Sequence, residues 1–344
     1  MTHLERFYAT ARRQPVDRPA CWLGLPDPAA LPALLKHFGA ADMADLKRAV
    51  DDDIWPVEVP YHDGKGNALY MAFDFAKSGT QSTAERTLTT PGFFEDCEDI
   101  DEVDNFPWPD PAQFMNAEAC RAAAMAVPDG YAGMAVMWAA HFQDACAAFG
   151  MENALMTMLT EPDVFKAVID RITEFYLAAG EIFYKATEGL LHAVLIGNDL
   201  GSQTGLIISP DALREFVLPG TRRLIAQAKA HGLVVVHHSC GAVFDIIPDL
   251  IEAGADVIHP IQALASGMQP ERLRDIYGGK VSFCGGVDAQ ELLVRGTPED
   301  IVQNVRKLCD LFPTGLIVSP SHEAILPDAP PANIEAIFKT VHGL

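Results

Sequence analysis

The chain has 344 residues, of which 49% are apolar and 21% are charged, a composition that can form a large globular core. It carries 47 acidic and 25 basic residues, which gives a formal net charge of −22. A surface this acidic repels nucleic-acid phosphates and anionic membranes, and it favours a partner with a basic rim.

The predicted strands and helices alternate along the chain. Eight short apolar runs lack polar alternation, which predicts strands that are buried on both faces. These runs are 19–23, 54–59, 131–138, 193–196, 233–237, 256–261, 281–284 and 316–319. Helical patterns cover 162–187, 211–231, 242–253 and 298–311. We expect the last of these to begin at a Thr297 N-cap, and Ser209 to begin the second in the same way.

This alternation favours one parallel (β/α)8 TIM barrel, with 1–344 as a single domain. Residues 62–111 differ from the rest, because they are rich in Gly and Pro and contain an acidic run at 95–104. We predict that they form an inserted hairpin and loop over one end of the barrel.

The cysteines and the N-terminus suggest a cellular location. Seven cysteines are scattered through the chain, and neither a signal peptide nor an apolar membrane span is evident. An odd number of cysteines without an export signal is typical of reduced thiols, so we expect a cytoplasmic protein. A homodimer is the expectation from general frequency.

Barrel enzymes place their chemistry at the C-terminal ends of the strands. Polar, Gly-rich sequence follows the last five predicted strands, at 197–203, 237–241, 259–262, 284–288 and 319–323. Neither a dinucleotide-binding Gly-x-Gly-x-x-Gly after a strand, nor a P-loop, nor a Gly-x-Ser-x-Gly elbow occurs. The candidate site residues are therefore expected at these five strand ends.

His238 and Cys240 are the sharpest local feature. Alternate residues of an extended chain point the same way, so this imidazole and thiol can reach one zinc ion. A catalytic zinc site uses three protein ligands and leaves one position open. His322 and Cys284 are the candidates for the third ligand, although Cys284 equally suits a small core residue.

Other polar residues are candidates for catalysis or substrate binding. Asp199 either orients a ligand histidine, binds a substrate cation or caps a turn, and together with His322 it is the catalytic candidate. The candidates for substrate binding are Asn198, Gln203, Gln262, His259 and Asp53. His259 either lines the site or packs beneath it. Asp53 belongs to the acidic run 51–53, which either faces the barrel mouth or forms a solvated loop.

The stretch 197–343 resembles the uroporphyrinogen decarboxylase superfamily, whose fold is a (β/α)8 barrel. The resemblance rests on the segments GNDLGSQTGLIISPDALREFVLPG, HHSCGAVFDIIPDLIEAGADVIHPIQ, VSFCGGVDAQELLVRGTPEDI and SPSHEAILPDAPPANIEAIF. RRQPVDRPA near the N-terminus and NFPWPDP also look like features of the family.

The superfamily has two main branches, and the resemblance implies different sites for each. Its decarboxylases hold tetrapyrrole carboxylates with arginines after the first strand, whereas residues 21–27 here contain none. Its corrinoid-dependent methyltransferases bind zinc through His-x-Cys and a distant cysteine on the last strand. His238 and Cys240 match the first two ligands, and His322 stands in the place of the distant cysteine.

The resemblance therefore implies a zinc-dependent methyltransferase. It would move a methyl group between a small molecule, an ether, amine or thiol, and a corrinoid on a separate protein. One alternative is a metal-independent decarboxylase. The other is a non-catalytic barrel that binds a metal or a ligand.

Overall fold

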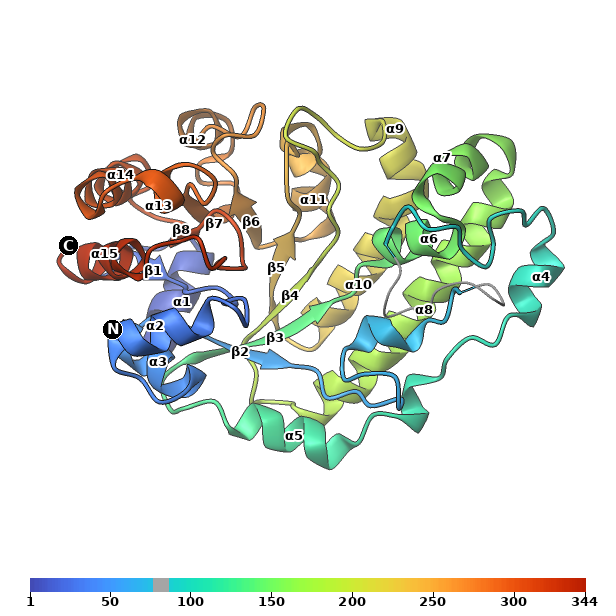
Figure 1. The fold of residues 1–344 in the computed structure, drawn as a ribbon, viewed down its shortest axis with the longest axis horizontal. Helices are drawn as coiled ribbons and strands as arrows, with labels where there is room; N and C mark the ends of the chain where they lie inside the picture. Colours follow the sequence, from blue (N-terminus) through green and yellow to red (C-terminus); the bar gives the residue numbers. More distant parts are fainter. Residues whose placement is uncertain (77–86) are drawn as a thin grey trace.

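The computed structural model describes residues 1–76 and 87–344 (Figure 1). Its strands are β1 (Ala20–Cys21), β2 (Ile54–Glu58), β3 (Ala132–Trp138), β4 (Ala193–Gly197), β5 (Val234–His238), β6 (Val257–Ile261), β7 (Ser282–Val287) and β8 (Leu316–Pro320). All eight predicted strands are present, and each registered pair is parallel. The predicted TIM barrel is confirmed.

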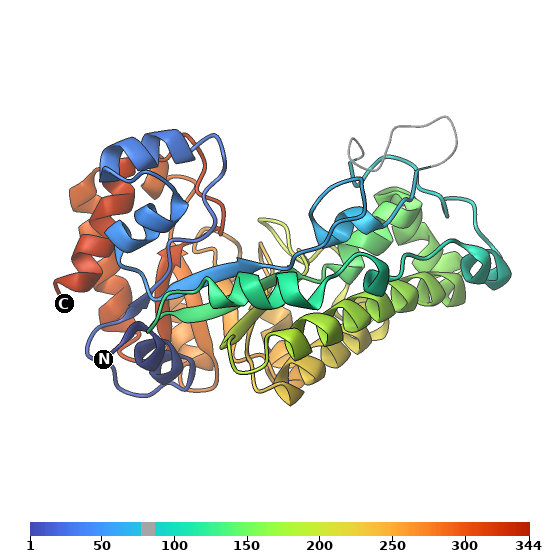
Figure 2. The same cartoon turned by 90° about the horizontal axis from the view of Figure 1, so that it is seen from below.

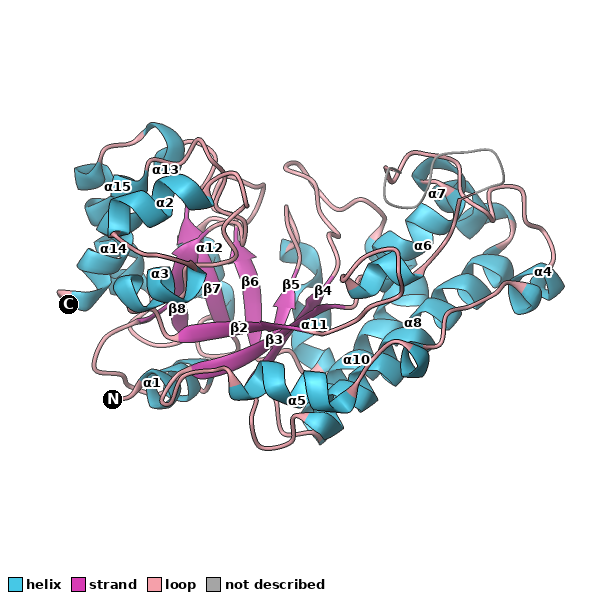
Figure 3. Ribbon diagram, turned by 60° about the horizontal axis from the view of Figure 1, so that its bottom comes forward, coloured by secondary structure: helices cyan, strands magenta, loops and turns pink. Residues whose placement is uncertain are grey.

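Helices cover the outside of the sheet (Figure 3). The α-helices are α1 (His3–Ala11), α2 (Leu31–Phe38), α3 (Met43–Val50), α4 (Ile100–Asn105), α5 (Ala117–Met125), α6 (His141–Phe149), α7 (Met151–Thr160), α8 (Pro162–Ala186), α9 (Pro210–Ala212), α10 (Leu218–Ala230), α11 (Ile247–Ala253), α12 (Pro270–Tyr277), α13 (Leu292–Arg295), α14 (Pro298–Leu311) and α15 (Pro331–His342). Shorter helical turns are η1 (Leu69–Ala72), η3 (Pro111–Gln113), η4 (Leu213–Val217) and η5 (Phe244–Ile246).

The predicted helix starts are confirmed, and prolines explain where the helices differ from prediction. Thr297 caps α14 in a capping box with Asp300, and Ser209 caps α9. The helix predicted over 211–231 contains the π-helical turn η4, just before Pro219, which has no N–H to donate within the helix. The helix predicted over 242–253 begins as a 3-10 turn, and α11 starts beside Pro248.

The sheet runs in the order β1-β8-β7-β6-β5-β4-β3-β2, so β1 and β2 are its two edge strands. A backbone hydrogen bond from Asp53 to the Cys21 carbonyl joins them at 2.9 Å. Two buried carboxylates complete the seam, because Asp53 accepts from the Cys21 N–H and Asp52 from the Leu23 N–H. The carboxylates of Asp52 and Asp53 therefore accept hydrogen bonds that backbone carbonyls would accept in a regular pair of strands.

Alternate strand residues face two different apolar layers. Ile54, Met134, Leu195 and Val236 belong to a cluster that fills the barrel interior. Val235 and its counterparts on other strands pack outward in the larger core beneath the helices. Because strand side chains alternate, one short apolar run serves both layers.

A helical arm extends from the barrel, as Figure 2 shows. It is built on α8, whose 25 residues span about 37 Å. Rings from the insert, Phe73, Phe75, Phe94 and Trp108, contact one another, and Phe73 packs on Phe175 of α8. This aromatic cluster anchors the insert to the arm.

The insert predicted over 62–111 is present but differs in form. Its described parts, 62–76 and 87–111, hold η1, α4 and loops, and no strand. The hairpin prediction is wrong for those parts, because their apolar residues pack as an aromatic cluster and not as cross-strand pairs. The remainder of the predicted hairpin, 77–86, lies outside the described residues. None of the described helices combines the length and apolar character needed to cross a membrane.

Candidate functional site

Residues from the ends of β4, β5 and β6 meet at the C-terminal mouth of the barrel. His238 Nε2 lies 3.1 Å from Asp199 Oδ1 and 3.6 Å from Cys240 Sγ. The other ring nitrogen of His238, Nδ1, lies 2.9 Å from His259 Nδ1. The His238 ring therefore lies between Asp199 and Cys240 on its Nε2 side and His259 on its Nδ1 side.

The chain turns sharply after β5 so that Cys240 can join this group. Gly241 has φ 87°, and an added Cβ would lie 2.3 Å from the carbonyl of Gly201 in the loop after β4. Only glycine fits that close approach of two backbones. The Gln262 side chain accepts from the Gly241 N–H at 2.7 Å and fixes the turn.

The electrostatics of this group favour a bound cation. Burial acts to raise the pKa of Asp199, but hydrogen bonds from His238 and the Cys240 N–H outweigh it and lower the pKa to about 2. Burial and the charges of Asp199 and Glu323 raise the pKa of the Cys240 thiol. Burial lowers the pKa of His259 well below its usual value, so that ring stays neutral. A cation beside Cys240 would reverse the penalty on its thiolate.

Two overlapping groups of metal-ligating residues share Cys240. In the first group, ligand atoms of Asp199, His238 and Cys240 all lie within 4.8 Å of one another. In the second group, the same holds for Cys240, His322 and Glu323. The predicted ligands His238 and His322 therefore lie in different groups. Glu323 was missed, although it directly follows His322 in the polar stretch after the last strand.

A cavity of about 650 Å³ opens beside the first group. Its lining includes Asp199 and His238 from the barrel, Trp138 from β3, and Asp144 from α6. Residues of η1 form another wall, so the insert covers this mouth as predicted. His322 instead lines a separate cavity of about 190 Å³ together with Gln262. The larger cavity is the candidate active site.

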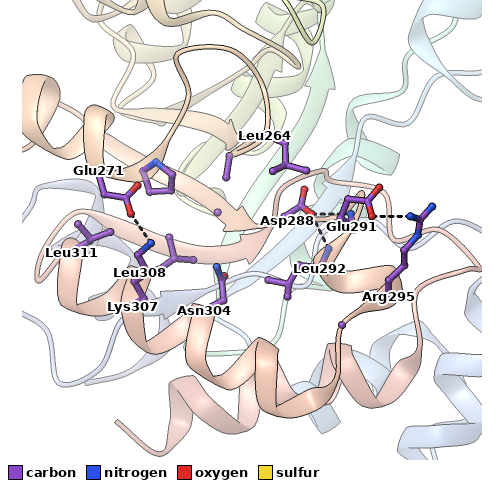
Figure 4. A pocket seen from close by; sticks show the side chains of 14 residues that line it. Leu264, Glu271, Asp288, Glu291, Leu292, Arg295, Asn304, Lys307, Leu308 and Leu311 are labelled. Carbon is purple, nitrogen blue, oxygen red and sulfur yellow. Dashed lines mark hydrogen bonds and ion pairs between the residues drawn. The ribbon is translucent and has the colours of Figure 1, made fainter.

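A second cavity of about 490 Å³ lies beside β7, among α12, α13 and α14 (Figure 4). Its charged side chains are internally paired, with Glu271 on Lys307 at 2.6 Å and Glu291 on Arg295 at 2.9 Å. Asp288 accepts from backbone N–H groups of Glu291 and Leu292. Its lining contains neither histidine nor cysteine. These charges pair with one another or with backbone N–H groups and hold the helices together.

Asp53 does not lie at the site. It precedes β2, at the N-terminal end of the barrel, where it is fully buried. Its carboxylate binds Arg6 at 2.6 Å, Arg18 at 2.8 Å and the Cys21 N–H at 2.8 Å. Its role is to close the sheet, so the predicted substrate contact is corrected.

Three further candidates also have structural positions. Asn198 is buried and its side-chain oxygen accepts from the Phe142 N–H at 2.8 Å, which caps the start of α6. Gln203 is exposed in the loop after β4 and does not line the cavity. Cys284 belongs to the apolar cluster inside the barrel, where burial raises the pKa of its thiol. None of the three lines the cavity, although Asn198 donates its backbone N–H to the His238 carbonyl at 3.1 Å.

His259 packs beneath the site and does not line the cavity. It is fully buried, its ring lies 5.2 Å from that of Trp22, and its side chain contacts His238 of the site through Nδ1. Gln262 likewise acts on the turn that carries Cys240. Asp144 was missed, because the helical pattern around it gives no sign that one face opens on a cavity.

Asp144 gives the folded protein a pH-dependent cost. Burial raises its pKa to about 7, although the Tyr176 hydroxyl that donates to it acts in the opposite direction. The folded pKa exceeds the unfolded value of roughly 4, so the folded state binds the extra proton between these values. The free energy of unfolding therefore falls as pH rises through this window, and the loss is complete above pH 7.

Asp144→Asn should relieve this cost, because asparagine keeps an acceptor for Tyr176 without a charge. Relative to the wild type, the variant should gain about 1 kcal/mol more at pH 8.5 than at pH 5.5, after allowance for solvent screening. Urea denaturation at both pH values measures the difference. The exposed Glu152→Gln serves as the control. An equal gain at the two pH values would contradict the assignment.

The comparisons with known proteins agree with the fold. A profile of the family described as uroporphyrinogen decarboxylase (URO-D) matches residues 2–344. A methyltransferase structure from Methanosarcina mazei superposes with a TM-score of 0.73 at 17% identity, covering 100% of this chain and 99% of that chain. At that identity the likeness concerns the fold alone.

Two curated relatives have different names. The chain is 29% identical over 189 residues to the methylated-thiol–coenzyme M methyltransferase of Methanosarcina mazei, covering 55% of this chain and 48% of that protein. It is 28% identical over 192 residues to a uroporphyrinogen decarboxylase of Syntrophotalea carbinolica, covering 54% and 51%. The matches thus span about half the length of each of these two relatives.

Proposed function

The chain belongs to the uroporphyrinogen decarboxylase family, and we propose that it is a methyltransferase within that family. The proposed reaction moves a methyl group between a heteroatom of a small molecule and a corrinoid carried by a separate protein. The observation that carries the proposal is the group Asp199, His238 and Cys240 at the mouth of the cavity. A relative named as a methylated-thiol methyltransferase supports it.

The residues fit a zinc ion. Ligand atoms around a tetrahedral zinc lie about 3.3 to 3.8 Å apart, given its bond lengths to nitrogen, oxygen and sulfur. The distances from His238 Nε2 to Asp199 Oδ1, 3.1 Å, and to Cys240 Sγ, 3.6 Å, are close to that range. We propose that these three residues hold the ion. The alternative keeps His238 and Cys240 and takes His322 as the third ligand, as the family resemblance implies.

Each residue has a distinct task in this proposal. His238 presents Nε2 to the ion because His259 occupies Nδ1, which fixes the ring. Asp199 stays ionised and adds negative charge at the cavity wall. Cys240 supplies the soft ligand. Zinc, when bound, supplies a Lewis acid that lowers the pKa of a substrate heteroatom.

The transfer is heterolytic in either direction. If the substrate donates, its heteroatom–methyl bond would break with the electron pair left on the heteroatom, and the reduced corrinoid of the partner protein would supply the pair for the new bond. If the substrate accepts, its lone pair would form the new bond, and the pair of the broken bond would stay with the corrinoid. The chain's residues bind and orient the heteroatom beside the open side of the cavity.

The cavity disfavours the decarboxylase alternative. A tetrapyrrole with several carboxylates needs cationic partners, and none of the described lining residues is Lys or Arg. Arg18, the cation just before β1, binds Asp53 at the opposite end of the barrel. Several curated relatives are nevertheless named uroporphyrinogen decarboxylase, so the test must separate the two activities.

The test supplies purified protein with a corrinoid protein and a panel of methylated ethers, amines and thiols, and follows the cobalt absorption spectrum. We expect a change of cobalt state with one donor class and its loss after chelation. A parallel assay with uroporphyrinogen measures carbon dioxide release. Decarboxylation that survives chelation would overturn the proposal. Metal binding with no turnover of either substrate type would instead identify a non-catalytic barrel.

A further inference from the structure

The candidate active-site cavity is lined by four acidic side chains, and His238 is the basic group among its described lining residues. Glu58, Asp144, Asp199 and Glu323 all line it, and its described lining residues include neither Lys nor Arg. Asp199 faces His238, whereas Asp144 has the Tyr176 hydroxyl as its hydrogen-bond partner. Glu323 Oε2 is buried and accepts no hydrogen bond from any described residue. Glu58 is exposed at the rim, whereas Asp144 and Glu323 are partly buried, and a carboxylate withdrawn from water is stabilised when a cation joins it.

Three aromatic rings also line this cavity. Tyr70, Trp138 and Tyr176 line it, from η1, β3 and α8 respectively. Tyr176 is almost fully buried, and its hydroxyl ties the ring to Asp144. A cation placed against such rings gains from their electron-rich faces, and the gain is largest where water is excluded.

The backbone at Trp138 is shaped to present its indole here. Trp138 and Ala139 have φ values of 58° and 53°, in the left-handed region that non-glycine residues seldom adopt. They follow a register shift between β3 and β4 at Val136 and Trp138. The indole then lies edge-on to the His238 ring, with centroids 5.2 Å apart. The indole therefore lines the cavity beside His238 of the metal-ligating group.

We propose that the substrate of this cavity carries an ammonium group, protonated or quaternary, held by Asp144 and Glu58 against the aromatic rings. This inference rests on the proposed methyltransferase function, in which the methyl-bearing end of the substrate reaches His238 and Cys240. To that function it adds the chemical class of the substrate. A neutral ether or a simple thiol would gain nothing from Asp144 and Glu58, whereas a cation would favour the ionised form of Asp144 and a carboxylated substrate would be repelled.

The test compares a cation with its neutral isostere. Isothermal titration calorimetry at fixed ionic strength measures choline and 3,3-dimethyl-1-butanol, which have the same shape and differ in charge. We expect the wild type to bind choline at least about 10-fold more tightly, as a cation among carboxylates and rings should. Equal affinities for the two probes, or no choline binding at millimolar concentration, would overturn the inference.

Two variants locate the preference in the cavity. Asp144→Asn should reduce the preference for choline by about 10-fold, because it removes one charge and keeps the shape. Glu152→Gln, an equivalent change at an exposed position of α7, should leave the preference unchanged. If Asp144→Asn fails to fold by circular dichroism, Tyr176→Phe is measured in its place and should weaken choline binding. An unchanged preference in a folded Asp144 variant would also overturn the inference.

The binding measurement needs neither a corrinoid protein nor turnover. A clear cation preference together with no methyl transfer from any donor would overturn the proposed function and retain the ammonium site. Methyl transfer from neutral donors with no cation preference would retain the proposed function and overturn the ammonium site. The two proposals therefore fail separately.

Discussion

Replacing Cys240 with serine is expected to remove the bound metal and to lower methyl transfer by more than about 100-fold, since even indirect partners of a metal ligand cost roughly 10- to 100-fold. Cys240 is the residue shared by both ligand groups, so its replacement removes a ligand from each of them. A serine hydroxyl is a poor substitute because the thiolate is the soft, anionic ligand that zinc prefers.

Metal content and activity are measured on the same preparations. The wild type should hold about one zinc per chain by elemental analysis, and His238→Ala should lose it as Cys240→Ser does. Cys309→Ser is the matched control, because Cys309 is also a half-buried free thiol but lies on α14, away from the mouth. Full metal content in Cys240→Ser would contradict the assignment.

The same series decides the third ligand. Asp199→Asn should cost more metal affinity than His322→Gln if Asp199 completes the centre, and the order should reverse if His322 does. The geometry favours Asp199, because its carboxylate lies beside His238 and opens on the same cavity, whereas His322 lines a different one. Both variants are titrated with zinc at constant pH.

Replacing Asp53 with asparagine is expected to lower the free energy of unfolding by about 3 to 5 kcal/mol, the usual cost of breaking a buried ion pair. Asp53 is fully buried, and it neutralises Arg6 and Arg18 at the seam between β1 and β2. Burial acts to raise its pKa, but hydrogen bonding to His3 and the charge of Arg18 outweigh this and lower the pKa. The amide would remove the carboxylate that pairs with Arg18 and would leave Arg6 paired with Asp17.

Urea denaturation followed by circular dichroism gives this free energy. Asp275→Asn is the control, because Asp275 is exposed and pairs with its neighbour Arg274 at the surface. Such a surface pair contributes between roughly 0 and 1 kcal/mol, so the control should stay within that range. A loss below 1 kcal/mol in Asp53→Asn would show that the seam does not depend on this carboxylate.

The net charge of −22 is reflected in the composition of the cavity wall. Four of the acidic residues line one cavity whose described wall has no Lys or Arg. The acidic surface disfavours polycarboxylate substrates and fits the proposed docking of a carrier protein with a basic rim. The same sign of charge inside the cavity is what leads to the ammonium proposal.

Local sequence patterns determined the elements of this protein. Apolar runs of a few residues predicted all eight strands, because strands buried on both faces need no alternation. Thr297 and Ser209 predicted helix starts, because a cap acts on N–H groups two or three residues away. The spacing of His238 and Cys240 also predicted that both side chains lie at one strand end, because the two residues are only two positions apart in the chain.

Only the tertiary structure decided which distant residues these would meet. Asp199 reaches His238 because β4 and β5 lie side by side, and Asp144 meets Tyr176 because α6 packs on α8. Asp53, which the sequence left open between mouth and solvent, is buried because Arg6 and Arg18 converge on it. Burial and charge partners depend on packing between segments far apart in the chain, and no local pattern encodes them.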